Sequence, residues 1–286
     1  MPELPEVETI VRALQNGGRE SPPLVGRVIR EAEIHWQRSL ATPRPEIFLQ
    51  KIRHQAVQRL GRRGKFILIH LNGPTLLVHL RMSGDLRLEP AADEAGRPLP
   101  PRPHDRLIFH LTDGWGLAFN DPRKFGRIWL ADDPQAVLNG LGPEPLDEAL
   151  TPPLFYQRLR RFRRQLKPLL LDQSFLAGLG NIYTDEALHL ARLHPLTPSH
   201  LLSEEEAARL LAAIRSVLQE GIRRNGASID WVYRGGSFQN YFRVYGRSGE
   251  PCPQCGTPVA RLLVGQRGTH FCPACQPLKV APAGGK

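Results

Sequence analysis

The sequence has few lysines and cysteines, and each scarcity limits what the protein can be. Of its 286 residues 38 are basic, but lysine occurs only at positions 51, 65, 124, 167, 279 and 286. An amine that can lose its proton near neutral pH is therefore rare, because arginine stays charged. All four cysteines lie between 252 and 275, which argues against a disulfide framework for the whole chain. No run of 18 apolar residues occurs, so no membrane-spanning helix is expected.

Acidic residues are outnumbered as well. Lys and Arg number 38 against 28 Asp and Glu, which gives a formal net charge of +10 and a pI near 9.9. This balance favours a polyanionic partner, although a soluble protein can be basic without one. The N-terminal MPELPEVE lacks the basic start and the apolar stretch of a signal peptide, so we expect a cytoplasmic protein.

Hydrophobic spacing divides the chain into an extended part and a helical part. Apolar residues recur at helical spacing in 5–16, which predicts an N-terminal helix. From 27 to 131 short apolar segments such as KFILIHL and RLIFHL alternate with turns, which predicts an antiparallel sandwich or barrel. Within it, the Pro-rich 89–104 predicts a mobile loop.

The pattern becomes helical after a Gly- and Pro-containing boundary at 140–148. It predicts one helix over 153–171, a second after Gly180, and a third over 204–224 that begins with a capping box. Residues 227–244 are polar and contain glycine, which predicts a loop.

The cysteines form two CxxC pairs separated by 16 residues. Four thiolates with this spacing match a tetrahedral zinc site, and a filled coordination shell makes the metal structural rather than catalytic. A pair of redox-active CxxC motifs is the alternative. Zinc ribbons also mediate protein contacts, so the metal alone does not establish DNA binding. The ligands would be Cys252, Cys255, Cys272 and Cys275.

Two features of the helical part suit a phosphate backbone. Five arginines cluster in 158–164, which indicates either a DNA-binding surface or a solvated helix face. In LAGLGNIY, at 176–183, glycines flank a turn into a helix, where backbone N–H groups and Asn181 would suit a phosphate oxygen. An ordinary packing corner between two helices would use the same glycines.

The N-terminus offers a nucleophile. Removal of Met1 would leave Pro2 with a secondary amine of pKa roughly 7.7–8.0, part of which is unprotonated at neutral pH. Its attack on a sugar C1′ would give an iminium that acidifies C2′ and permits strand cleavage by elimination. Glu3 would be the general acid, with Glu6 one turn on, and Lys65 could shuttle protons. The alternative is an acidic first turn favoured by the helix dipole.

These residues together resemble the formamidopyrimidine-DNA glycosylase family of bacteria, and the resemblance covers nearly the whole chain. The family's motifs occur in order: PELPEVE at 2–8, GRRGKF at 61–66, HLRMSG at 79–84, DPRKFG at 121–126, KPLLLDQ at 167–173, GLGNIY at 178–183, VYGR at 244–247 and the cysteine segment. The resemblance implies an α+β multidomain fold. Its parts would be an N-terminal β-sandwich with an N-terminal helix, a helix–two-turn–helix domain and a C-terminal zinc finger.

The resemblance also implies a bifunctional activity. The enzyme would excise 8-oxoguanine and formamidopyrimidines and then cleave the strand as an AP lyase. Pro2 matches the Schiff-base nucleophile and Glu3 the proton donor, with Glu6 beside them. Lys65 matches the lysine assigned to β-elimination, and Arg267 the arginine assigned to δ-elimination.

The remaining site residues follow from the same resemblance. Met82, Arg123 and Phe125 match the trio that fills the hole left by the extruded base. The segment Ser237–Tyr241 matches the loop that covers that base. We expect contacts with the DNA backbone from His104, Arg123, Arg163, Arg164, Lys167 and Asn181.

We expect a catalytic domain at 1–143, a DNA-binding domain at 144–236, a base-capping loop with the zinc finger at 237–278, and a disordered tail at 279–286. We further expect a cytoplasmic, nucleoid-associated monomer that holds one structural Zn²⁺ and binds double-stranded DNA containing oxidised purines. Two alternatives stay open. One is an endonuclease VIII-like enzyme directed at oxidised pyrimidines, and the other is a catalytically silent DNA-binding protein on the same scaffold.

Overall fold

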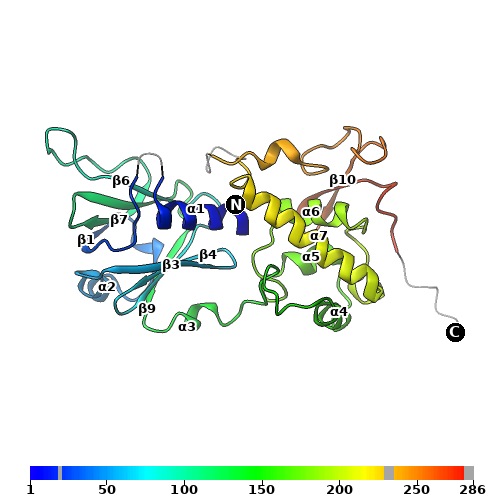
Figure 1. Cartoon of the computed structure of the whole chain (residues 1–286), viewed down its shortest axis with the longest axis horizontal. Coiled ribbons are helices and arrows are strands. Elements are labelled where there is room, and N and C mark those ends of the chain that lie inside the picture. Colours follow the sequence, from blue (N-terminus) through cyan, green and yellow to red (C-terminus); the bar gives the residue numbers. More distant parts are fainter. Residues whose placement is uncertain (19–20, 229–234, 280–286) are drawn as a thin grey trace. The chain divides into compact units, whose positions relative to one another are not determined.

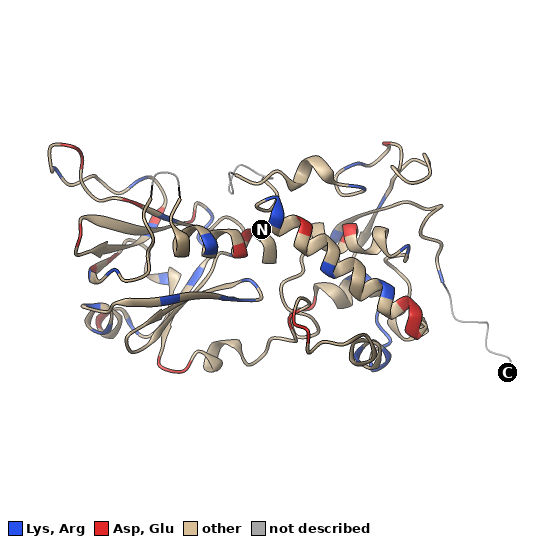
Figure 2. Cartoon of the chain, in the orientation of Figure 1, with Lys and Arg blue, Asp and Glu red and all other residues tan. Residues whose placement is uncertain are grey.

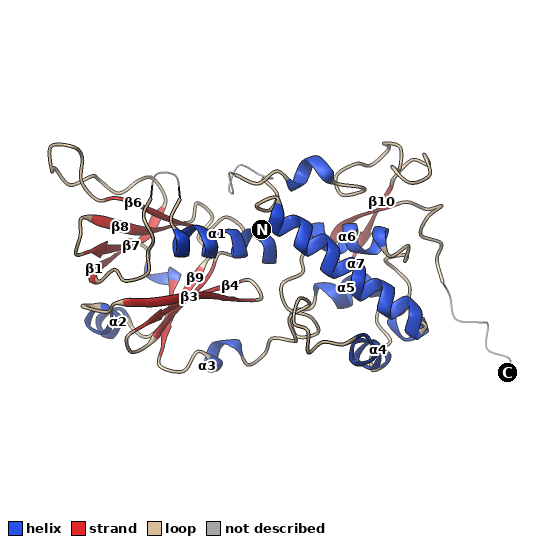
Figure 3. Ribbon diagram, in the orientation of Figure 1, coloured by secondary structure: helices blue, strands red, loops and turns tan. Residues whose placement is uncertain are grey.

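The computed structural model describes residues 1–18, 21–228 and 235–279, which form two compact units (Figure 1). The first unit holds Met1–Asn139 with Ser228–Gly235, and the second holds Gly140–Ala227 with Gly236–Lys286. Strands dominate the first unit and helices the second (Figure 3). Of the helices in the described ranges, none combines the length and the apolar character needed to cross a membrane.

The N-terminal helix is confirmed as α1 (Leu4–Asn16). It begins with a capping box formed by Glu3 and Glu6, and proline stands in its first turn, where the missing N–H costs no helical hydrogen bond. Its apolar stripe is buried, and the helix packs against β3 and β4 of the neighbouring sheet.

Two sheets share one hydrophobic core in the first unit, which confirms the predicted sandwich. The first sheet has the order β1 (Ile29–Ile34), β7 (Asp105–Leu111), β8 (Trp115–Asn120), β6 (Asp85–Pro90), and its pairs are antiparallel. The second has the order β2 (Leu40–Thr42), β9 (Arg127–Ala131), β5 (Thr75–His79), β4 (Phe66–Leu71), β3 (Val57–Arg63). Here β2 and β9 are parallel and the other pairs antiparallel.

Short helical segments complete this unit: η1 (Gln37–Ser39), α2 (Pro45–Ile52) and α3 (Gln135–Leu138). Helix α2 was not predicted, and it buries Phe48 and Ile52 in the sandwich core. In the predicted loop 89–104, β6 extends to Pro90, and Ala92 bridges Pro98.

The second unit contains α4 (Pro152–Arg160), α5 (Leu166–Leu171), α6 (Asn181–Leu190), η2 (Ser199–Leu201), α7 (Glu204–Arg223) and η3 (Phe238–Tyr241). The predicted helix after Gly180 and the capped helix over 204–224 are confirmed. Of the predicted loop 227–244, residues 229–234 lie outside the described ranges, and η3 lies in its last part.

The single helix predicted over 153–171 is wrong. The chain leaves the helix after Arg160 and starts again at Leu166. A continuous helix would need an N–H at Pro168 for the Arg164 carbonyl, and proline has none. The Arg164 carbonyl instead accepts from Ser199 N (2.8 Å), and Leu166 N donates to the Thr197 carbonyl (2.9 Å). Hydrogen bonds to a distant segment therefore replace the helical ones.

Between its two cysteine pairs, the cysteine segment forms a hairpin of β10 (Ala260–Val264) and β11 (Arg267–Phe271), and β11 packs against α6. The chain beyond the hairpin continues to Lys279, whose Nζ donates to Glu206 Oε2 (2.8 Å). The rest of the tail that was expected to be disordered, 280–286, lies outside the described residues.

Candidate functional site

The start of α1 holds two buried carboxyl groups next to Pro2. Glu3 and Glu6 are each 2% exposed, and Pro2 is buried as well. Glu3 N donates to Glu6 Oε2 (2.8 Å), which fixes the backbone directly after Pro2. Both carboxyl groups also lie at the positive end of the helix dipole. Glu6 thus orients the chain that carries Glu3 and Pro2.

Lys65 lies in the tight turn between β3 and β4, after Gly64 at φ 57°. It is 4% exposed, which is unusual for a lysine. Arg62 connects this turn to α1, because its Nε donates to Glu8 Oε2 (2.9 Å) and its Nη1 to the Gly64 carbonyl (3.2 Å). Burial alone would raise the pKa of Glu8, but hydrogen bonds from Arg62 and Arg12 lower it. The lysine turn and the N-terminal helix are therefore held together.

His79 is a site candidate that the sequence interpretation missed. It pairs with Phe66 across β5 and β4, and the two rings meet edge to face at 4.7 Å. Burial, with the charges of Arg81 and Lys65, lowers the pKa of His79 to about 3, so the imidazole is neutral. Its Nδ1 accepts from Arg81 N (3.0 Å), which leaves the proton on Nε2 as a donor. The signal was available, because His79 opens the motif HLRMSG.

The proposed trio for base replacement lies on two turns of the first unit. Met82 is half-buried, Arg123 is exposed and Phe125 is 50% exposed, with the Arg123 guanidinium 5.4 Å from the Phe125 ring centroid. His104 is exposed close by, since its carbonyl accepts from Asp121 N (3.0 Å) and its Nδ1 lies 3.3 Å from Arg106 Nη2. The structure thus places His104 beside the turn of Arg123 and Phe125, which belong to the trio that the sequence singled out.

Arg163 and Arg164 are exposed, but they lie in the break between α4 and α5 rather than on a helix face. Arg164 Nη1 donates to Asp172 Oδ2 (2.6 Å), whose pKa is lowered by hydrogen bonds from Ser174 and from Arg164. Arg158 and Arg160 are committed to the Phe175 and His200 carbonyls (2.9 and 3.0 Å). The arginine cluster is therefore partly structural.

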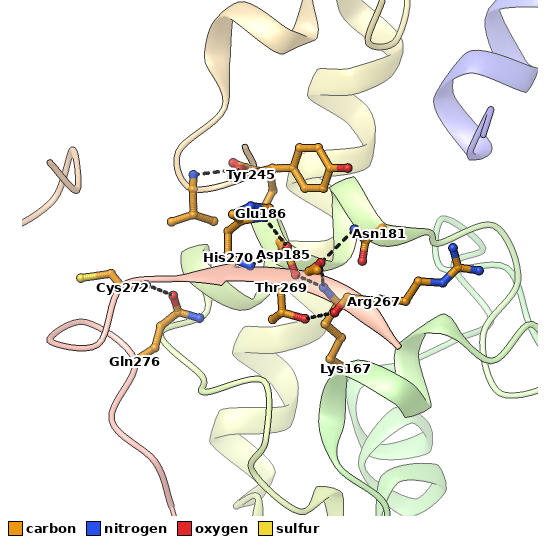
Figure 4. A network of polar contacts seen from close by, with 12 residues as sticks. Lys167, Asn181, Asp185, Glu186, Tyr245, Arg267, Thr269, His270, Cys272 and Gln276 are labelled. Atoms are coloured by element: carbon orange, nitrogen blue, oxygen red, sulfur yellow. Dashed lines mark hydrogen bonds and ion pairs between the residues drawn. The ribbon is translucent and has the colours of Figure 1, made fainter. Parts of the chain in front are cut away.

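Lys167 needs a correction, because it is not placed for a direct DNA contact. Its side chain is 0% exposed, and its Nζ donates to Asp185 Oδ1 (2.6 Å) and to the Gly268 carbonyl (3.0 Å) (Figure 4). A phosphate would have to enter a closed ion pair to reach it. Lys167 instead joins α5 to α6 and to the zinc-finger hairpin.

Helix α6 provides further contacts to the cysteine segment. Asn181 Nδ2 donates to the Gly268 carbonyl (3.0 Å), and Asp185 Oδ2 accepts from His270 N (2.9 Å) (Figure 4). Glu186 accepts from three backbone N–H groups, those of residues 243–245, at 2.9 Å each. Burial raises the pKa of Glu186, while these hydrogen bonds act in the opposite direction. The hairpin is therefore fixed to α6 by buried polar contacts.

Arg267 is exposed at the start of β11, directly after the turn formed by Gly265 and Gln266, both at positive φ. Its neighbour Gly268 is the residue whose carbonyl Lys167 and Asn181 hold. The guanidinium of Arg267 thus extends from a backbone segment that α5 and α6 position.

The four cysteines fit a zinc ion. Their Sγ atoms all lie within 4.8 Å of one another, with Cys252–Cys275 at 4.0 Å and Cys255–Cys272 at 3.5 Å. A tetrahedral Zn²⁺ with Zn–S bonds of about 2.3 Å would place its sulfurs about 3.8 Å apart. His189 Nε2 lies 3.3 Å from Cys252 Sγ, and Gln276 Oε1 accepts from Cys272 N (2.9 Å). The metal supplies folding energy to this segment and no open coordination position.

Ser237 stands directly before η3, and Tyr241 is the last residue of η3. Ser237 N donates to the Arg224 carbonyl (2.9 Å), and the Arg224 guanidinium lies 3.7 Å from the Tyr241 ring centroid. Phe238, between them, is 1% exposed and stacks on Tyr183 at 5.1 Å. Tyr241 is 47% exposed and lines a pocket of about 200 Å³ beside α7.

Three family models match the chain. The formamidopyrimidine-DNA glycosylase N-terminal domain matches residues 1–128, and the H2TH domain of that glycosylase matches 141–232. The zinc finger found in FPG and IleRS matches 249–278.

Curated relatives resemble the chain over nearly its whole length. It is 46% identical over 285 residues to the formamidopyrimidine-DNA glycosylase of Chloroflexus aurantiacus, which covers 96% of this chain and 98% of the relative. It is 44% identical over 290 residues to the enzyme of that name from Pelotomaculum thermopropionicum, with 98% and 100% covered.

Solved structures of the same family also resemble the chain over nearly its whole length. Wild-type Lactococcus lactis Fpg in complex with DNA containing N7-benzyl-Fapy-dG superposes with a TM-score of 0.87 at 36% identity. Lactococcus lactis Fpg in complex with DNA containing Fapy-dG superposes with a TM-score of 0.86 at 36% identity. In both cases 96% of this chain and 100% of the other are covered.

Proposed function

The chain belongs to the formamidopyrimidine-DNA glycosylase family, and we propose that it excises oxidised purines from duplex DNA through the amine of Pro2. It is a base-excision-repair DNA glycosylase with the AP lyase activity characteristic of the family, and its cofactor is one structural Zn²⁺. The observation that carries the residue assignment is the pair of buried carboxyl groups beside Pro2, on a helix fastened to the lysine turn.

The proposed chemistry starts once Met1 is removed. The Pro2 nitrogen attacks C1′ and loses its proton, and the N-glycosidic bond breaks with its electron pair leaving on the base. The C1′–O4′ bond then breaks and the nitrogen lone pair forms the C1′ iminium, while Glu3 donates a proton to the departing base or to the ring oxygen O4′. The iminium that forms acidifies C2′. Lys65 takes the C2′ proton and the 3′ phosphate leaves; Arg267 assists the second elimination, which expels the 5′ phosphate. The product is a one-nucleotide gap flanked by phosphates.

Lesion recognition is proposed for the two turns of the sandwich and for η3. Met82 and Phe125 would replace the stacking lost on base extrusion, and Arg123 would hydrogen-bond the orphaned cytosine. The exposure of Arg123 and Phe125 and the apolar character of Met82 and Phe125 support this role. Ser237 and Tyr241 would cover the extruded base.

The backbone contacts are proposed for His104, Arg123, Arg163, Arg164 and Asn181, all but Asn181 being exposed. We assign the catalytic domain to 1–143, the DNA-binding domain to 144–236 and the loop with the zinc finger to 237–278, followed by the tail. The partner would be double-stranded DNA containing oxidised purines, and the protein a cytoplasmic, nucleoid-associated monomer.

The test is borohydride trapping of protein whose mass shows that it begins at Pro2. We expect a covalent adduct with 8-oxoguanine paired with cytosine, and faster excision of that base than of thymine glycol. Glu3→Gln should lower base excision by at least about a hundredfold, since general acid catalysis contributes roughly 10²–10⁴-fold. The matched control, Glu46→Gln in the first turn of α2, should leave excision unchanged.

Each alternative predicts a different result. Faster removal of thymine glycol would favour an endonuclease VIII-like specificity. An absence of adduct with the mature protein would favour a silent DNA-binding protein. Unchanged excision by Glu3→Gln would remove Glu3 as the acid.

A further inference from the structure

The turns that carry Met82 and the Arg123–Phe125 pair form one corner of the sandwich. Turn 80–84 leads from β5 in one sheet to β6 in the other, and turn 121–126 leads back from β8 to β9. Because β5 pairs with β9 and β6 with β8, the two turns must lie side by side. The register confirms this: His79 is opposite Arg127 in one sheet and Asp85 opposite Asn120 in the other.

A single buried carboxylate connects the two turns. Asp121 is 0% exposed, and its Oδ1 accepts from the Ser83 hydroxyl of the neighbouring turn and from Arg123 N (3.2 Å). Its Oδ2 accepts from Gly126 N (2.7 Å). A buried carboxylate needs such donors, and hydrogen bonds to a charged acceptor are stronger than neutral ones. Asp121 thus binds the backbone of turn 121–126 at Arg123 and at Gly126, and it binds turn 80–84 through Ser83.

Ser83 completes this connection. It is 2% exposed, and its Oγ donates to Asp121 while accepting from Arg123 N (3.3 Å). One hydroxyl therefore touches the backbone of Arg123 and belongs to the residue directly after Met82. Because a serine hydroxyl can donate and accept together, it bridges the two turns without a further partner.

The turns have little room to move separately. A Cβ on Gly126 would lie 2.4 Å from Phe119 Cζ, and a Cβ on Gly84 would lie 2.5 Å from the Leu80 carbonyl oxygen. Both glycines are therefore required by close approach. Two contacts with other parts of the sandwich also hold turn 121–126: Arg106 Nε donates to the Asp121 carbonyl (2.8 Å), and Lys124 Nζ lies 4.1 Å from the Trp36 ring centroid.

We propose that Asp121 and Ser83 are positioning residues for base-pair recognition, which set Met82, Arg123 and Phe125 in one fixed arrangement. This inference rests on the proposed function, because it needs that trio to occupy the space of the extruded base. Neither residue touches the DNA or the reacting atoms. Their role is to keep the guanidinium of Arg123 aimed at the orphaned base while Met82 and Phe125 take up the stacking.

Substitutions of Asp121 or Ser83 that remove this connection between the two turns should impair one function of the protein and leave another intact. Asp121→Asn keeps the volume but turns one acceptor into an NH₂ group that faces an N–H donor in a buried place. Ser83→Ala removes only the bridge between the turns and leaves Asp121 its two backbone donors. Both variants should disturb recognition of the partner base and leave the chemistry at Pro2 intact.

The experiment measures three single-turnover rates for each variant: excision of 8-oxoguanine opposite cytosine, excision opposite adenine, and cleavage at an abasic site in single-stranded DNA. The third substrate offers Pro2 an aldehyde but has no partner base. For Asp121→Asn we expect about a tenfold loss opposite cytosine, the worth of one charged hydrogen bond, with the cytosine-to-adenine ratio falling toward one. Single-strand cleavage should stay within about twofold. Ser83→Ala should act in the same direction with a smaller change.

The controls separate this inference from the proposed function. Asp133→Asn removes an exposed carboxylate that likewise accepts a backbone N–H, from Gln135 (2.9 Å), and should change none of the rates. Arg123→Ala and Phe125→Ala test the trio directly; if they leave the cytosine-to-adenine ratio unchanged, the recognition role itself fails. If they change it and Ser83→Ala and Asp121→Asn do not, the positioning role alone fails.

Two further outcomes are decisive. An equal loss on all three substrates would mean general damage and would overturn the positioning role. If Asp121→Asn does not fold, as thermal melting would show, Ser83→Ala carries the test, because it leaves no buried carboxylate without donors.

Discussion

At the scale of single residues, the surroundings of Lys65 limit competition for protons. The imidazole of His79, on the adjacent strand, has its pKa lowered to about 3 by burial and by the charges of Arg81 and Lys65. Glu8 and Arg62 are paired with each other next to the same turn. The proposed role of Lys65, which is to accept a proton from carbon, benefits from such an environment, since neither His79 nor the paired Glu8 is a strong competing base.

The buried His79 should also make stability depend on pH. Its pKa is about 3 in the folded protein against 6.5 for the unfolded chain, so the unfolded chain binds more protons between these values. Stability should therefore fall as the pH is lowered from about 6.5, by on the order of 3 kcal/mol at pH 4 from this residue. Phe in its place keeps the ring contact with Phe66 and removes the titration.

Urea unfolding of wild type and His79→Phe between pH 4 and pH 7 measures this contribution. The variant should show a flatter decline on the acid side. His35→Phe, on an exposed histidine, is the matched control and should follow the wild type. Parallel curves for His79→Phe and the wild type would show that His79 does not contribute.

At the scale of elements, local signals predicted local structure well. The caps of α1 and α7 are set by residues three positions apart, and both helices begin where the sequence indicates. The break between α4 and α5 follows partly from Pro168, a local signal that the predicted helix overlooked. It follows also from the hydrogen bonds that join Arg164 to Ser199 and Leu166 to Thr197, which no local pattern encodes. Tertiary contacts overrode helical spacing there.

The same division applies to the site. Short motifs were enough to predict the zinc ligands, Lys65 and the residues of the two turns that end at Gly84 and Gly126. The burial of Lys167 does not, because its partners Asp185 and Gly268 lie 18 and 101 positions away. A basic residue in a basic segment suggested a phosphate contact, whereas the fold gave it an internal ion pair. His79 and Asp121 were likewise in quoted motifs, and only the structure shows what they touch.

The contact between α6 and the zinc site leads to a prediction. His189 is 5% exposed and its Nε2 lies 3.3 Å from Cys252 Sγ, so it can donate to that thiolate. Loss of an outer partner of a metal ligand typically costs 10–100-fold in affinity. His189→Phe should therefore release zinc to a chelator about tenfold faster, measured with a colorimetric zinc indicator. His200→Phe, on η2, is the control.

Zinc release should also weaken DNA binding, because the metal supports the hairpin that carries Arg267. Metal-free protein that bound DNA as tightly as the zinc form would contradict this, and equal zinc release by His189→Phe and wild type would contradict the role of His189.

At the scale of the whole molecule, basic residues are spread over the elements of both units (Figure 2). With a net charge of +10, the protein should bind DNA with an affinity that falls steeply with salt. Each lost phosphate contact should reduce the slope of log K against log salt by about 1. Arg163→Ala should do so across sequences, without changing base preference.

Fluorescence anisotropy with a lesion-containing duplex over a range of salt concentrations provides the measurement. The control is Arg30→Ala, an exposed arginine on β1 that pairs with Glu31 and is not a proposed contact. Should Arg163→Ala and Arg30→Ala share the wild-type slope, Arg163 is not a phosphate ligand.

The four-thiolate centre makes this repair enzyme vulnerable to the agents whose damage it removes. Cys255 is exposed, whereas Cys252 and Cys272 are buried. Peroxide attacks accessible thiolates most readily, and a sulfenic acid at Cys255 would be a poor ligand. Loss of the metal would loosen the hairpin that carries Arg267, the residue we propose for the second elimination. Severe oxidative stress would thus inactivate the enzyme when its substrates are most abundant, unless cellular reductants restore the thiol.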